Sequence, residues 1–94
     1  MIDENSIVIR SQDLISSDID SEIVMLSIKN GKYYGLNITG SHIWMLLQSS
    51  ISIKDICNLL VKEFTIDQHQ CMQEVMIFIN TLIDKNLVEV VDAH

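Results

Sequence analysis

The sequence contains no proline and only three glycines among its 94 residues. A chain with so few breakers has no flexible or proline-rich linker, and it shows no internal repeat or low-complexity tract. It also lacks any apolar run near the roughly 20 residues that span a bilayer. Ninety-four residues suit one domain, so residues 1–94 are expected to fold as a single unit.

Basic residues are scarce as well: six Lys and Arg stand against thirteen Asp and Glu, giving a formal charge of −7. Nucleic-acid-binding surfaces normally carry a basic stripe, whereas here only Lys29 and Lys32 lie close together. The composition therefore disfavours a nucleic-acid partner. The first ten residues are polar and acidic, unlike a secretory signal, so we expect a soluble cytoplasmic protein with no membrane partner.

Side chains with catalytic chemistry are few. Cys57 and Cys71 lie on apolar helical stripes without CxxC spacing, which predicts two buried thiols rather than a disulfide. His42, His69 and His94 lack the neighbours that a catalytic nucleophile or a zinc site requires. No phosphate-binding or dinucleotide-binding motif is present. We therefore expect no enzyme activity, no cofactor and no metal.

Apolar residues, in contrast, make up 48% of the chain, which is enough for a packed core. β-Branched residues alternate along the sequence up to about residue 38, and this pattern predicts strands. The expected strands cover residues 6–10, 22–29 and 32–36, and a polar loop is expected at residues 16–21.

A hairpin is predicted between the second and third of these strands. Asn30 and Gly31 both tolerate positive φ, and this dipeptide favours a type I′ turn. Val24, Leu26 and Ile28 share one face of the strand before the turn.

After residue 38 the apolar period becomes helical, and three helices are expected. Thr39, Ser52 and Asp67 are their predicted N-caps. The second helix has one apolar face, formed by Ile53, Ile56, Cys57, Leu60 and Phe64. Residues 87–91 either form a final short strand or simply extend the chain end.

The third helix carries two apolar stripes. The first consists of Cys71, Val75, Phe78 and Leu82. The second, rotated by about 100° at 3.6 residues per turn, consists of Met72, Met76, Ile79 and Ile83. One stripe is enough to dock a helix on a small core, so the second is either buried too or left for a partner. Methionine is common at adaptable binding surfaces, which favours a partner slightly.

Two function classes remain open at this point. A three-stranded sheet with three helices also describes a winged helix-turn-helix, so a DNA-binding regulator is one alternative, although the charge opposes it. A structural subunit that oligomerises through an exposed apolar face is another. Neither reading follows from a motif.

The pattern Y-x-L-N-x-T-G-x-x-I-W-x-x-L at residues 34–47 resembles the PqqD-like family, whose members are also called RiPP recognition elements. Its fixed positions are Tyr34, Leu36, Asn37, Thr39, Gly40, Ile43, Trp44 and Leu47. A tail formed by Phe78, Leu82, Leu87 and Val88 supports the resemblance, which covers roughly residues 6–91.

The resemblance implies an α+β, winged-helix-turn-helix-like fold in which a three-stranded antiparallel N-terminal sheet packs on three α-helices. It implies a non-catalytic adaptor that binds the leader peptide of a ribosomally synthesised, post-translationally modified peptide precursor. The leader would add a strand to the sheet edge at residues 32–36, beside the third helix. The implied enzyme partner is a lasso-peptide leader peptidase or cyclase, with a radical SAM enzyme, as for the pyrroloquinoline quinone precursor, as the other possibility.

The expected peptide-binding residues are Lys29, Lys32, Tyr33, Tyr34, Gly35, Leu36, Met72, Val75, Met76, Ile79 and Ile83. In this hypothesis Gly35 lets another backbone approach, and the second stripe of the third helix forms an apolar wall. The two lysines attract acidic residues of the leader. The competing interpretation is that Tyr34 and Leu36 belong to the core and that the lysines only keep the turn soluble.

Overall fold

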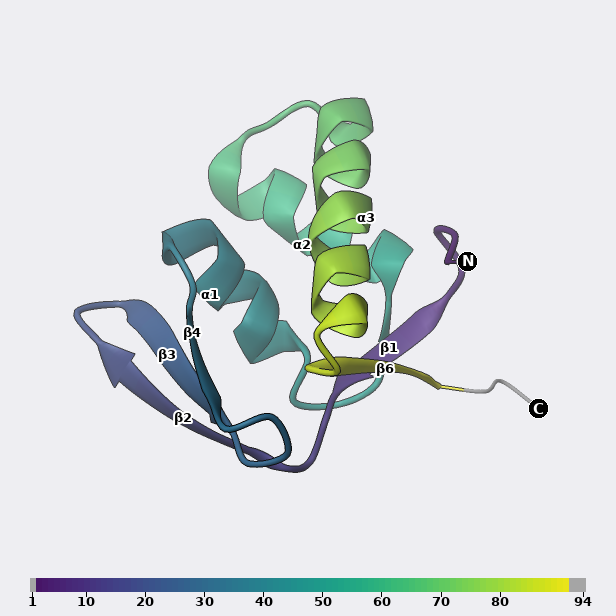
Figure 1. Cartoon of the computed structure of the whole chain (residues 1–94). Coiled ribbons are helices and arrows are strands. Elements are labelled where there is room, and N and C mark those ends of the chain that lie inside the picture. Colours follow the sequence, from purple (N-terminus) through teal and green to yellow (C-terminus); the bar gives the residue numbers. More distant parts are fainter. Residues whose placement is uncertain (1, 92–94) are drawn as a thin grey trace.

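The computed structural model of the chain describes residues 2–91 as nine short elements (Figure 1). In chain order these are β1 (Ile7–Arg10), β2 (Leu14–Ile19), β3 (Glu22–Ser27), β4 (Lys32–Gly35), α1 (Ile38–Leu46), β5 (Ile51–Ser52), α2 (Ile53–Phe64), α3 (Gln68–Asp84) and β6 (Val88–Val91). None of the helices in this range is long and apolar enough to cross a membrane.

The strands form two antiparallel sheets of three strands each, with the orders β5-β1-β6 and β2-β3-β4. The α+β class and the three-stranded N-terminal sheet are confirmed, but the membership of that sheet differs from the prediction. The strand expected at residues 6–10 pairs instead with β5 and β6, in a separate sheet (Figure 1). One of its partners, β6, lies within residues 87–91, so of the two possibilities for that segment the final short strand is the correct one.

The predicted polar loop at residues 16–21 is mostly strand, and only its last two residues form a turn. Ile19 pairs with Glu22, so only Asp20 and Ser21 connect β2 to β3, and both have positive φ, at 52° and 69°. Positive φ at both central residues is the geometry of a type I′ hairpin. Asp18 supports the turn, since its Oδ1 accepts a hydrogen bond from the Ser21 N–H at 3.1 Å.

The type I′ turn predicted at Asn30-Gly31 is wrong. Ser27 pairs with Lys32, so four residues connect β3 to β4, and of the central dipeptide only Gly31 has positive φ, at 68°. Ser27 anchors this longer loop: its carbonyl accepts from the Gly31 N–H at 2.7 Å and its hydroxyl from the Asn30 N–H at 3.2 Å.

Side-chain caps begin all three helices. Ser52 and Asp67 accept hydrogen bonds from the N–H groups of Asp55 and Gln70, at 3.1 and 2.9 Å, as predicted. The predicted cap at Thr39 is wrong, because α1 begins earlier. Asn37 is its N-cap and accepts a hydrogen bond from the Gly40 N–H at 2.8 Å.

The core lies between the helices and the inner faces of both sheets. In β3 it is Ile23, Met25 and Ser27 that are buried, so the face with Val24 and Leu26 points away from the core. Cys57 and Cys71 are free, buried thiols, as predicted. Trp44, the only tryptophan, is 1% exposed and belongs to the buried core.

Candidate functional site

Strand β4 is an open edge of its sheet: among residues 2–91 it pairs only with β3. The N–H of Leu36 donates to the carbonyl of Ile23 at 2.8 Å, so this residue turns its backbone toward β3. Backbone groups alternate in direction along a strand, so Tyr34 and Lys32 also face β3. The N–H and C=O groups of Tyr33 and Gly35 therefore point to the open edge.

A groove of about 400 Å³ lies next to the end of this strand, between β4, the start of α1 and α3. Its apolar walls include Leu36 from the segment after β4, Ile43 from α1, and Val75 and Phe78 from α3. Glu74 is the charged residue of this lining. The groove joins a free backbone edge to an apolar cleft, which is the pair of features that an extended peptide needs.

The groove wall on α3 differs from the predicted one. In the second stripe, Ile79 is fully buried, and Met72, Met76 and Ile83 are half-buried against the core. Met72 Sδ lies 3.8 Å from the Sγ of Cys57, so the first residue of this stripe contacts α2. None of its four residues lines the groove, and contact of this stripe with the leader stays a prediction.

Phe78 and Glu74 line the groove but were not among the expected peptide-binding residues. The glycine of the Thr-Gly step in the motif could have indicated that Phe78 lies at this site. A Cβ built at Gly40 would lie 3.2 Å from the Phe78 ring, so only glycine leaves the ring its full space there. The glycine thus allows α1 and α3 to approach closely at the groove.

Ser41 fixes the end of the edge strand to α1. It is 4% exposed, and its Oγ accepts a hydrogen bond from the Ile23 N–H at 2.9 Å. The same hydroxyl donates to the carbonyl of Leu36 at 3.3 Å. One buried side chain therefore positions β3, the residue after β4 and the first helix relative to one another.

The two tyrosines have different environments. Tyr34 is half-buried against the core, with the ammonium of Lys85 5.6 Å from its ring centroid. The Nδ2 of Asn30 lies 3.5 Å from the Tyr34 hydroxyl and donates to the carbonyl of Lys85 at 3.2 Å, which ties the β3–β4 loop to the end of α3. Tyr33 is 73% exposed and lies on the opposite face of the strand.

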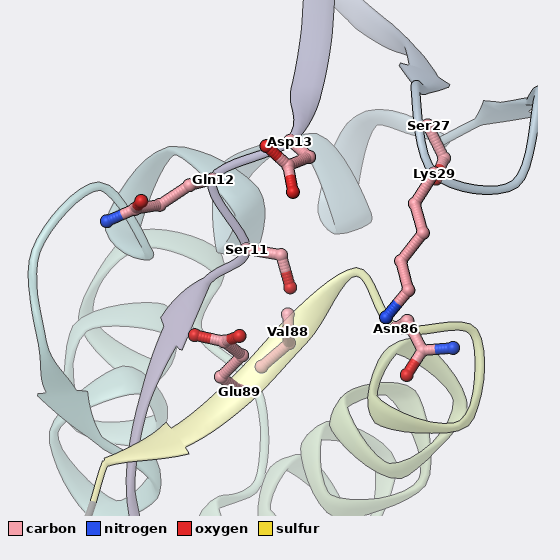
Figure 2. Close-up of a pocket in the computed structure, with 8 residues that line it drawn as sticks. All are labelled: Ser11, Gln12, Asp13, Ser27, Lys29, Asn86, Val88 and Glu89. Atoms are coloured by element: carbon pink, nitrogen blue, oxygen red, sulfur yellow. The ribbon is translucent and has the colours of Figure 1, made fainter.

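The two lysines do not act as a pair. Lys29 extends into a separate polar pocket of about 320 Å³, where Figure 2 shows its ammonium group beside Asn86. Asp13 and Glu89 line the same pocket. Lys32 is exposed on the edge strand, on the face shared with Tyr34. Of the two, Lys32 is the one on the open edge strand, at the end of β4 away from the groove.

The described residues contain no cluster of three His, Cys, Asp or Glu side chains arranged for a metal. Burial, with the neighbouring Cys71 thiol, raises the pKa of Cys57 to about 12, so this thiol stays protonated at neutral pH. A protonated thiol is a poor nucleophile. His42 packs edge-on against Phe64, with ring centroids 5.1 Å apart.

Comparisons with known proteins agree with this geometry. The family model described as coenzyme PQQ synthesis protein D (PqqD) matches residues 22–88. The solved structure of TbiB1 in complex with the TbiA(beta) leader peptide superposes with a TM-score of 0.81 at 31% identity, covering 86% of this chain and 94% of that one. A lasso peptide synthetase B1 complexed with the leader peptide has the same fold, with a TM-score of 0.77 at 18% identity over 87% and 96% of the two chains. No curated protein sequence matches the chain.

Proposed function

The chain belongs to the PqqD family, and we propose on this premise that it is a non-catalytic adaptor for a leader peptide. It binds the leader of a ribosomally synthesised, post-translationally modified peptide precursor by strand addition, and it presents the precursor to a modifying enzyme. The observation that carries the proposal is the open edge of β4 beside the groove on α3.

The edge supports backbone pairing of a definite kind. The free N–H and C=O groups of Tyr33 and Gly35 can hydrogen-bond to one added strand, antiparallel or parallel, at the usual strand spacing of about 4.8 Å. Exposed edges are normally blunted by charges, proline or a covering element. This edge carries one charge, Lys32, and a glycine.

The groove supports recognition of side chains. Ile43, Val75 and Phe78 favour an apolar residue of the leader at the Gly35 end of the edge. Glu74 at this end disfavours an acidic residue, whereas Lys32 at the other end attracts one. Opposite charges at the two ends give the bound peptide a preferred direction.

A lasso-peptide setting is the more strongly supported one. The two matched structures are TbiB1 with a leader peptide and a lasso peptide synthetase B1 with its leader. The enzyme partner that we propose is therefore the leader peptidase of the same pathway. DNA binding has no support, because the formal charge is −7 and the matched structures hold peptides.

The test is titration of a fluorescent leader peptide from the precursor encoded beside this chain. We expect a dissociation constant of tens of micromolar or tighter, or about −6 kcal/mol or better. Absence of binding in this range contradicts the proposal.

A pair of variants at Gly35 locates the binding edge. Gly35→Pro removes an N–H that the fold does not use, and proline is tolerated at edge strands. We expect at least tenfold weaker leader binding with little change in melting temperature. Gly35→Ala keeps the N–H, and its Cβ meets nothing within 4 Å in the folded chain, so we expect it to weaken leader binding less than Gly35→Pro does. Equal affinities of the proline variant and the wild type would place the peptide elsewhere.

A further inference from the structure

The outer face of the β2-β3-β4 sheet is apolar and uncovered. Ile15 and Tyr33 are 56% and 73% exposed, and the half-buried Leu26 lies between them, since the register pairs all three across the sheet. Ile19, at 57%, and Ile28, at 60%, extend this outer face along the strands. The helices lie against the other face, where Met25 and Ile23 are buried (Figure 1).

The charges on this face have one sign. Residues 11–28, which form β2, β3 and the turn between them, contain four carboxylates and neither Lys nor Arg. Strand alternation places Glu22 on the outer face itself, with Asp20 in the turn. The nearest cations point elsewhere: Lys29 lies beside Asn86, and Lys32 shares the inner-face register with Ser27.

We infer that the outer face is the docking surface for the modifying enzyme, and that the enzyme's matching patch has an apolar centre and a Lys/Arg rim. This inference rests on the proposed function. Exposed apolar patches of this kind mark interaction sites, and complementary charge around them gives specificity and a faster association. Apolar contact with Ile15, Leu26 and Ile28 supplies affinity, while the carboxylates select a basic partner.

The position of the face relative to the peptide supports an enzyme as the occupant. Tyr33 contributes its side chain to the outer face and its backbone to the free edge of β4. A leader strand added there continues the same sheet, so an enzyme that acts on the leader approaches alongside this face. A second copy of the chain fits the face poorly, because pairing two such faces brings Asp20 and Glu22 near the carboxylates of the other copy.

The test compares two substitutions that are chemically identical. Ile15→Lys places a cation at the centre of the outer face, whereas Ile77→Lys places one on α3, at a side chain that is 68% exposed. The probe is the purified leader peptidase encoded beside this chain, immobilised for interferometry, with the leader peptide titrated in parallel. Ile28→Lys replaces the first variant if that variant fails to fold.

We expect Ile15→Lys to weaken peptidase binding at least tenfold and to leave leader affinity unchanged, with Ile77→Lys like the wild type. Binding of the wild type should also weaken as salt rises. Equal peptidase binding by both variants, or none by the wild type, overturns the inference while leader binding still upholds the proposed function. A wild-type dimer in light scattering that Ile15→Lys dissolves overturns it too, since the face then belongs to a second copy. Absence of leader binding by the wild type is a different outcome, which would contradict the proposed function itself.

Discussion

Ser41 offers the most quantitative test of how the binding edge is held in place. Ser41→Ala removes the acceptor of the Ile23 N–H and leaves that group buried, since Ile23 is 5% exposed. A buried donor without a partner costs about 1–3 kcal/mol. Alanine recovers up to about 0.5 kcal/mol through its higher helix propensity in α1. The expected net loss in the free energy of unfolding is therefore about 2 kcal/mol.

Urea unfolding measures this loss through the fluorescence of Trp44, the only tryptophan and fully buried. With a slope of about 1–1.5 kcal/mol per molar urea, the midpoint should fall by about 1.5 M. Ser17→Ala is the matched control, because Ser17 is an exposed strand residue, and its expected change is within about 0.5 kcal/mol. Equal midpoints for the two variants would show that the Ile23 N–H finds another partner and that Ser41 is not the link described above.

Two further predictions concern the groove and the thiols. Gly40→Ala should change stability little, because the helix gains about 1 kcal/mol while the Phe78 ring is pushed aside. The displaced ring narrows the groove, so leader affinity in the titration should fall. An unchanged affinity would show that Phe78 is not part of the site. The pKa of Cys57 is raised from 9.0 to about 12, so the unfolded thiol loses its proton first and the free energy of unfolding should fall as pH rises between these values. Cys57→Ala should flatten that fall in urea titrations, and alkylation of native Cys57 or Cys71 at pH 8 would contradict their burial.

Local signals in the sequence predicted the elements that local chemistry determines. Ser52 and Asp67 cap helices as expected, and both thiols are buried. Strand β2 was missed because its turn, Asp20-Ser21, lacks the glycine that normally marks positive φ. The pairing of β1 with β5 and β6 was missed for another reason. It joins segments far apart in the chain, and the alternation of apolar residues in one strand does not show which strand it pairs with.

The strand part of the predicted site matches an open edge in the structure, whereas most of the predicted helix residues lie outside the groove; peptide contact at either stays a prediction. The edge at residues 32–35 followed from the resemblance, and the structure leaves it open. On α3 the two stripes are about 100° apart, so a moderate rotation of the helix decides which one enters the core. Ile79, expected on the spare stripe, is fully buried, while Phe78, expected in the core, is half-buried at the groove. Periodicity gives the faces of a helix but not its rotation against the neighbouring elements.

The pairing of β1 with β6 also has a consequence for the order of folding. Ile7 pairs with Val91, so this sheet closes only when both ends of the described chain have met. Contacts between distant segments form slowly, because loop closure must precede them, whereas β2, β3 and β4 join through consecutive hairpins. During synthesis the edge of β4 is therefore made before α3 exists to wall the groove. A nascent chain has an unprotected edge first and a selective peptide site only after its last helix has docked.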